Sequence, residues 1–380
     1  AIGDRLSSRR HSLASGGSRY TAGSMDGALD EQRMPARRSL PFAQQLGLMG
    51  VIVLLAALLT VAGNFNAPDG GRNANLFFNF DNLFNGVATN MAIYAIMAVG
   101  MTIVVVTGGI DISVGSTWAL AALLTAWAVR VPFVQVDTAG FWYVPLALGI
   151  SLGVGAICGL ANGLLTVGLR IHPFIITLGT MSIFRGLANV LAPEKSLPGQ
   201  GQILPSAMSN LMQYDFGGGL RLVPMIVTVI TVLIGGFYLS KMIAGRETYA
   251  VGGNSEAARF SGIRVDRVLI RAYLLCGMCA GLAGFVMLGR YGAVSTNSGS
   301  GDELLVVASC VVGGASLAGG RGSALGALLG ALVIKLIENA IYVMHWNEEY
   351  RSIIIGLAII VAVAIDRLSE ITRRFRPRTV

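Results

Sequence analysis

The sequence predicts an all-α, polytopic membrane protein of about ten transmembrane helices, some of them broken, in two inverted halves behind a disordered N-terminal tail. Of the 380 residues, 54 % are hydrophobic and only 13 % are charged, whereas soluble domains carry roughly 25 % charge. The net charge of +8 does not indicate a nucleic-acid partner, because most Lys and Arg residues lie at the ends of apolar segments. We therefore expect membrane lipid to be the main environment of the chain.

The N-terminal tail, 1–41, differs in composition from the rest of the chain. It is rich in Ser, Gly and Arg and poor in large apolar side chains, which predicts disorder on the cytosolic side. The first apolar run, 42–62, is long enough to span a bilayer, so we expect a retained anchor and not a cleaved signal peptide. A transmembrane domain is predicted over 42–370, followed by a basic cytosolic tail over 371–380.

Ten apolar segments are long enough, or nearly long enough, to cross a bilayer. The third and eighth are short and flanked by glycine, so they are predicted to be broken or re-entrant helices. The ten segments cover approximately 42–63, 87–107, 112–130, 142–168, 171–191, 222–243, 266–288, 303–319, 322–343 and 350–367.

The distribution of Lys and Arg residues between the connecting segments predicts the orientation. Most of them fall on the side of the N-terminus, including those of the loop 245–267, which places both termini in the cytosol. Ten spans with one long loop after the sixth suggest two halves of five, and an odd number per half makes the halves inverted. Asn162 and Gly179 recur as Asn339 and Gly356 at the same spacing, a weak trace of such a repeat.

The stretch GGIDISVGS, residues 108–116, places polar residues between long apolar runs. Glycine is unfavourable inside a helix, and irregular backbone at membrane depth must be buried in protein or line a cavity. The stretch is therefore predicted to break a helix. Two roles stay open for Asp111: together with Ser113 it contacts a hydrophilic solute, or it caps the N-terminus of the helix that follows.

Other small and charged residues inside the apolar segments predict helix packing. Gly322, Gly326 and Gly330 recur at intervals of four, and five glycines with Asn162 line 149–163, a pattern that lets helix backbones approach closely. Asp302, with Glu303, directly precedes the eighth segment, as at an ordinary helix start.

The charges inside the spans are few. Lys335 and Glu338 are three residues apart and can pair on one helix face. Arg185 has no obvious local partner and is expected to extend toward the outer surface. Cys276 and Cys279 form a CxxC without a second Cys or His pair nearby, so they are predicted to pack as apolar residues, and no metal or cofactor is expected.

The cytosolic loop 245–267 contains a short helical pattern, SEAARFSG. It begins with Ser, continues with Ala and Arg and stops at Gly. A simple connection between two spans would not need such an element. The pattern indicates a docking surface for a cytosolic partner, and a solvated linker is the alternative.

At these residues the sequence resembles the permease subunit of bacterial ABC importers for monosaccharides, the family of the ribose, xylose, arabinose and autoinducer-2 systems. Several motifs occur in the family's order over roughly 85–370. They are GGIDISVGS (108–116), ANG (161–163), HPFIITLGTMSIFRG (172–186), YAVGGNSEAARFSGIRV (249–265) and GGASLAGGRGS (313–323).

The resemblance implies a non-enzymatic transport subunit in the bacterial inner membrane. Its expected partners are a second permease copy, a cytosolic ATP-binding subunit, a periplasmic sugar-binding protein and the monosaccharide itself. The residues implied for the translocation path are Gly109, Asp111, Ser113, Gly115, Ser116 and Asn162. Those implied for the ATPase-coupling loop are Gly253, Asn254, Glu256, Ala257, Arg259 and Gly262.

Some features remain unassigned by the sequence. No phosphate-binding loop GxxxxGK[ST] occurs, so ATP hydrolysis is expected on a separate subunit. The inserts 66–81 and 193–221 depart from the family pattern. No motif identifies the sugar or the binding protein.

Two other functions are compatible with parts of the sequence. An ion-coupled secondary sugar transporter also uses inverted repeats and broken helices, but it should carry deep ionisable residues as ion sites. An intramembrane aspartyl protease would pair Asp215 of a Tyr-Asp dipeptide with Asp302 of GSGD, yet both acids are predicted in a loop or at a helix start. The ion-coupled transporter is the closer alternative.

Overall fold

A computed structural model describes residues 43–65, 75–132 and 140–347, together with scattered positions from 349 to 360. The chain divides into two units, residues 1–43 and residues 44–380, and only the second is described below. The predicted N-terminal tail, most of the predicted tenth segment and the predicted C-terminal tail lie outside the described residues.

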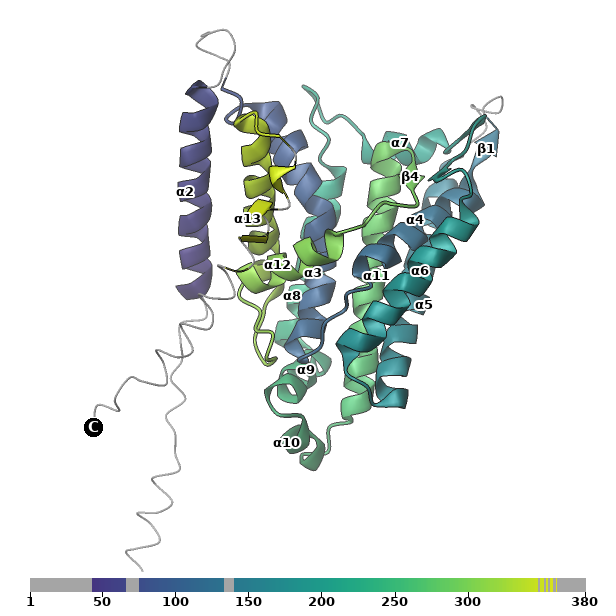
Figure 1. Cartoon of the computed structure of the whole chain (residues 1–380), viewed down its shortest axis with the longest axis vertical. Coiled ribbons are helices and arrows are strands. Elements are labelled where there is room, and N and C mark those ends of the chain that lie inside the picture. Colours follow the sequence, from purple (N-terminus) through teal and green to yellow (C-terminus); the bar gives the residue numbers. More distant parts are fainter. Residues whose placement is uncertain are drawn as a thin grey trace, which may run out of the picture. The chain divides into compact units, whose positions relative to one another are not determined.

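Within the described part, seven helical segments are long and apolar enough to cross a membrane. This confirms the prediction of a mostly helical, polytopic membrane protein (Figure 1). The seven segments are α2 (Ala43–Phe65), the π-helix η1 (Asn82–Ala88) continued by α3 (Thr89–Val106), α5 (Tyr143–Leu169), α6 (Pro173–Leu191), α8 (Val223–Lys241), α11 (Val265–Tyr291) and α13 (Ala324–Val343).

Helix α3 lies at the centre of the described bundle. It is apolar on all sides, as expected for a helix surrounded by protein. In the η1–α3 segment, 89 % of the residues of an 18-residue apolar stretch are buried. Helix α3 contacts α8, α11, α12 (Asp302–Val312) and α13, whereas α4 (Val114–Val129) packs on α5, α6 and α11. By contrast, α2, α5, α6 and α8 keep many large apolar side chains exposed, which is suitable for contact with lipid.

The glycines of α5 let it pack backbone-to-backbone on α11. A Cβ at Gly155 would collide with the carbonyl oxygen of Gly277, and one at Gly159 with the carbonyl oxygen of Tyr273. Gly149 has open space instead. The predicted small-residue face therefore exists, but the glycines at its N-terminal end do not contribute to it.

The predicted third and eighth segments are both short. Helix α4 has 16 residues, and α12 has only 11 where the sequence predicted a segment over 303–319. The expected eighth segment was too long, because the residues after Val312 form a glycine-rich loop with positive φ at Gly314 and Gly319. Apolar composition continues into this loop although the helix does not.

Short elements join the helices at the two ends of the bundle. The insert 193–221 contains β2 (Ser196–Leu197), β3 (Gln202–Ile203) and α7 (Ser206–Met212). Antiparallel pairs join β3 to β1 (Val131–Pro132) and β2 to β4 (Val294–Ser295). Helices α9 (Ile243–Gly253) and α10 (Ser255–Phe260) follow α8 and lie at the lower end of the bundle in Figure 1.

Candidate functional site

The chain breaks between α3 and α4, as the GGIDISVGS stretch predicts. Helix α3 ends at Val106, Gly108 follows with a φ of +84° that disfavours other residues, and Ser113 is the N-cap of α4. Asp111 and Ser113 are 1 % and 0 % exposed. The break therefore lies inside the protein, one of the two settings in which irregular backbone is tolerated at membrane depth.

The Asp111 carboxylate caps the turn that leads into α4. Its Oδ1 accepts hydrogen bonds from the Ser113 amide at 3.0 Å and from the Ser113 hydroxyl at 2.6 Å. The sequence left two roles open for Asp111, capping and contact with a solute, and these hydrogen bonds correspond to capping. A solute contact is not part of the described geometry and stays a prediction.

Asn162 of α5 connects this turn to two other helices. Its Nδ2 donates to the Ser113 hydroxyl at 2.7 Å and to Asp111 Oδ1 at 3.2 Å. Its Oδ1 accepts from the Thr180 hydroxyl of α6 at 2.6 Å. All four side chains are buried, so they form one hydrogen-bonded group, the Asp111 cluster (Asp111, Ser113, Asn162, Thr180), that joins α4, α5 and α6.

The remaining residues implied for the path adjoin this cluster. A Cβ at Gly109 would meet the Tyr273 hydroxyl of α11, and one at Gly115 would collide with the backbone before α12. The Ser116 hydroxyl donates to the carbonyl oxygen of Ser113 at 2.9 Å. The structure thus places all six residues implied for the path around the break between α3 and α4. Their role in a path stays a prediction.

Asp302 begins α12 and connects two other helices. Its two carboxylate oxygens accept from the Tyr94 hydroxyl of α3 at 3.2 Å and from the Trp118 indole of α4 at 3.0 Å. Asp215, the other acid of the protease alternative, is exposed and accepts from the amides of Gly217 and Gly219 in its own loop. The two acids have separate partners and do not form a pair.

The charged residues of the spans have partners that the sequence reveals only in part. The predicted pair of Lys335 and Glu338 is present at 2.5 Å, and Arg351 also contacts Glu338, at 2.6 Å. Arg185 was expected to extend to the surface without a local partner. Instead, its Nη1 donates to the carbonyl oxygens of Thr296 and Ser298, so it fixes the loop before α12.

The SEAARFSG pattern forms helix α10. Asn254 is its N-cap, and the side chain accepts a hydrogen bond from the Ala257 amide at 2.9 Å. Gly262 follows the helix with a φ of +84°, the common helix stop. Ala258 faces inward and packs with Val251 and Val265.

The six residues implied for the coupling loop share one property: each is exposed. They lie on or beside α10 and form its outer surface, here called the α10 surface. They are Gly253, Asn254, Glu256, Ala257, Arg259 and Gly262.

The sequence reasoning missed the most exposed apolar side chain of this surface. Phe260 ends α10 and is 92 % exposed. Aromatic side chains often provide much of the energy of protein interfaces. The signal was present as an aromatic residue at the end of a short polar helix, flanked by Arg259 and Ser261.

Helix α9 attaches the α10 surface to both glycine-rich breaks. A Cβ at Gly252 would collide with the carbonyl oxygen of Val106, the last residue of α3. The same carbonyl accepts from the Gly320 amide at 2.8 Å, and the Tyr249 hydroxyl donates to the carbonyl oxygen of Gly322 at 2.7 Å. An external force on α10 would therefore act on the end of α3 and on the loop that leads from α12 into α13.

Residues 83–363 match the family model described as the permease component of a branched-chain amino acid transport system. No solved structure matches the chain.

Three curated relatives are similar over most of their length. The ribose import permease of Bacillus subtilis strain 168 is 36 % identical over 328 residues, which are 85 % of this chain and 93 % of the relative. The D-allose transport permease of Escherichia coli K12 is 32 % identical over 84 % of this chain and 91 % of its own. A probable ABC transporter permease of Sinorhizobium fredii is 34 % identical over 87 % and 92 %.

Proposed function

Because the chain belongs to the family of membrane permeases matched over residues 83–363, we propose that it is the permease subunit of an ATP-driven ABC importer for a monosaccharide. It is a multi-pass membrane protein and a transport subunit. Among the curated relatives are permeases named for ribose, fructose, D-allose and autoinducer 2. These names support a sugar or a related solute over a branched-chain amino acid.

The observation that carries the proposal is the α10 surface. A short, capped helix presents an acid, a base and an exposed Phe260 outward, while α9 beneath it packs on the end of α3 through Gly252. This is the geometry needed by a docking element that receives force from a partner. We infer that the partner is a cytosolic ATP-binding subunit. ATP hydrolysis is assigned to that subunit because this sequence contains no GxxxxGK[ST] loop.

The transport cycle that follows from this assignment is mechanical. ATP binding brings two copies of the ATPase together, which moves the α10 surfaces of two permease copies and, through α9, shifts α3 and the loop between α12 and α13. Packed helices respond to such a force by discrete rigid-body shifts. The Asp111 cluster and the glycines beside it lie at the moving junction, and we propose that they border the path when it opens.

The remaining assignments follow from the same orientation. We propose that both termini and the loop 245–267 face the cytosol and that the insert 193–221 faces a periplasmic sugar-binding protein. The transmembrane domain is assigned to 42–370, between a tail over 1–41 and a tail over 371–380. An ion-coupled mechanism is not favoured, since the relatives are import permeases and the described charges of α13 pair with each other or with Arg351.

The test is co-purification of the tagged protein from its native membrane with an ATPase assay of the complex. We expect an ATPase subunit to co-purify with the wild-type chain and to be lost with Glu256→Lys and Arg259→Glu. Arg221→Glu is the matched control, an exposed charge reversal away from α10, and should retain the subunit. A chain that purifies alone and transports sugar on an ion gradient would overturn the proposal.

A further inference from the structure

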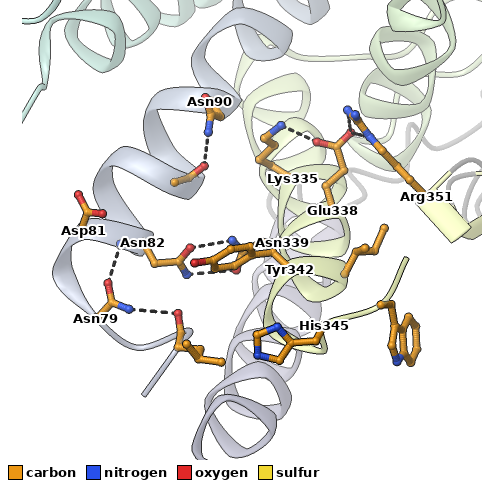
Figure 2. A pocket seen from close by; sticks show the side chains of 14 residues that line it. Asn79, Asp81, Asn82, Asn90, Lys335, Glu338, Asn339, Tyr342, His345 and Arg351 are labelled. Atoms are coloured by element: carbon orange, nitrogen blue, oxygen red, sulfur yellow. Dashed lines mark hydrogen bonds and ion pairs between the residues drawn. The ribbon is translucent and has the colours of Figure 1, made fainter. Parts of the chain in front are cut away.

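A polar pocket of about 690 Å³ opens between residues 76–90, at the start of the η1–α3 segment, and residues 335–351, at the end of α13 and beyond it (Figure 2). We call it the α13 pocket. None of the twelve residues implied for the path or the coupling loop lines it. Its volume is within the range of about 300–1,000 Å³ that small-molecule sites occupy.

The charges of the α13 pocket balance. Glu338 accepts from Lys335 at 2.5 Å and from two nitrogens of Arg351 at 3.0 and 2.6 Å. Asp81 is the fourth charged residue of the lining, so two cations face two anions. A pocket of one sign concentrates ions of the other. A balanced pocket favours a neutral solute with many hydrogen-bonding groups.

A pair of amides holds the wall between the two segments in place. Asn82 Nδ2 donates to Asn339 Oδ1 at 3.1 Å, and Asn339 Nδ2 donates back to Asn82 Oδ1 at 2.8 Å (Figure 2). The backbone N–H of Asn82 donates a hydrogen bond to Asn79 Oδ1 at 2.7 Å. The polar wall is thus formed before any solute binds, which lowers the entropy cost of binding.

At the end of α13 and just beyond it, the pocket is lined by side chains whose polar groups make no hydrogen bond in the part of the chain that the structure describes. Tyr342 and Trp346 are 63 % and 49 % exposed, and neither side chain, nor that of His345, has a hydrogen bond within the described residues. Each combines a flat apolar face with a polar tip. The faces suit the C–H surface of a sugar ring, and the tips suit its hydroxyl groups.

We propose that the α13 pocket binds a neutral monosaccharide within one permease copy, apart from the Asp111 cluster. This inference rests on the proposed function, because the sugar class comes from it. Binding depends on hydrogen bonds from the amide and charged wall and on stacking against Tyr342 and Trp346. The pocket opens on the side assigned above to the periplasm, where it would receive the solute before the path opens.

The test uses the complete transporter with D-ribose and D-allose as probes. Tyr342→Cys in the reconstituted complex is labelled with a membrane-impermeant maleimide. The wild-type chain, labelled in the same way, measures the background reaction of the native cysteines. Trp142→Cys is the matched control, because Trp142 is 57 % exposed, lies outside the insert 193–221 and does not line the pocket. We expect one of the sugars to slow labelling at position 342 at least threefold and to leave labelling at position 142 unchanged.

Uptake kinetics separate the inference from the function on which it rests. Tyr342→Ala and Trp346→Ala should raise the KM of uptake at least fivefold, whereas Trp142→Ala should not. ATP-driven uptake with an unchanged KM and no protection at position 342 would overturn the pocket assignment and leave the importer standing. No uptake of either sugar, with no protection, would count against both. Protection by the sugar-free binding protein alone would also overturn the inference, by making the pocket a protein-docking surface.

Discussion

The Asp111 cluster and the α10 surface are both rich in polar groups, yet they are built in opposite ways. The cluster is buried, and its carboxylate, amide and hydroxyl groups bond to one another. The α10 surface is exposed, and only Ala258 of the helix is buried. Buried, mutually bonded groups hold helices together, whereas exposed groups on a capped helix are available to a partner. Substitutions should therefore affect stability at the first region and association at the second.

The largest effect is expected from Asp111→Ala. It removes the acceptor of the Ser113 amide and of Asn162 Nδ2 inside the protein, and unsatisfied buried donors cost about 3 kcal/mol together. We expect a clear fall in Tm of the purified permease and less folded protein in the membrane. Asp111→Asn is the control, since an amide oxygen keeps the cap. Normal transport by Asp111→Asn would leave capping as the role of this residue, whereas wild-type stability of Asp111→Ala would show that the cluster does not hold the helices.

The next effect is expected at the contact between α9 and α3. Gly252→Ala forces a methyl group into the carbonyl oxygen of Val106, and such overpacking costs about 1–3 kcal/mol. We expect a lower Tm and weaker stimulation of the ATPase by sugar-loaded binding protein. Gly253→Ala is the neighbouring control for the Tm, because open space surrounds that position. An equal Tm of the two variants would contradict the close contact.

A purely associative effect is expected from Phe260→Ala. The ring is 92 % exposed, so the Tm of the isolated permease should not change. Its loss should weaken binding of the ATPase subunit about tenfold, as for an aromatic residue at the centre of an interface. Titration of the ATPase against detergent-solubilised permease measures this, with Phe216→Ala as the exposed aromatic control. Unchanged affinity would place the docking contact elsewhere.

The smallest effect is expected from Asn254→Ala. The substitution removes the side-chain bond to the Ala257 amide and costs about 1 kcal/mol of local helix stability. Hydrogen exchange of α10 should become faster while the Tm stays the same. Asn254→Ser should restore most of the protection. A lower Tm would show that α10 contributes to the core, which would contradict its assignment as an exposed surface for a partner.

Local signals in the sequence were sufficient for α10 and for the break before α4. Gly262 ends α10 as predicted, and Ser255 is its first residue, although the N-cap is Asn254 and not the serine. Gly108 allows a backbone that a helix cannot contain. These features depend on neighbouring residues only. The extent of the eighth segment was wrong, because the apolar loop after Val312 has the composition of a helix and the geometry of glycine turns.

Tertiary contacts could not be inferred in the same way. Thr180 reaches Asn162 only because α5 and α6 fold against each other, and no spacing rule connects Arg185 to Thr296. The α13 pocket joins residues near 80 with residues near 340. Asparagines scattered over two distant segments form no motif, so the pocket became visible only in the folded chain.

The central claim is that the α10 surface docks a separate ATPase, and site-specific photo-crosslinking in the native membrane tests it most directly. A photoreactive residue replaces Phe260 in one strain and Tyr214 in another, both being exposed aromatic positions. We predict an adduct with a nucleotide-binding subunit from position 260 and none from position 214. No such adduct from position 260, or equal adducts from both positions, would contradict the account.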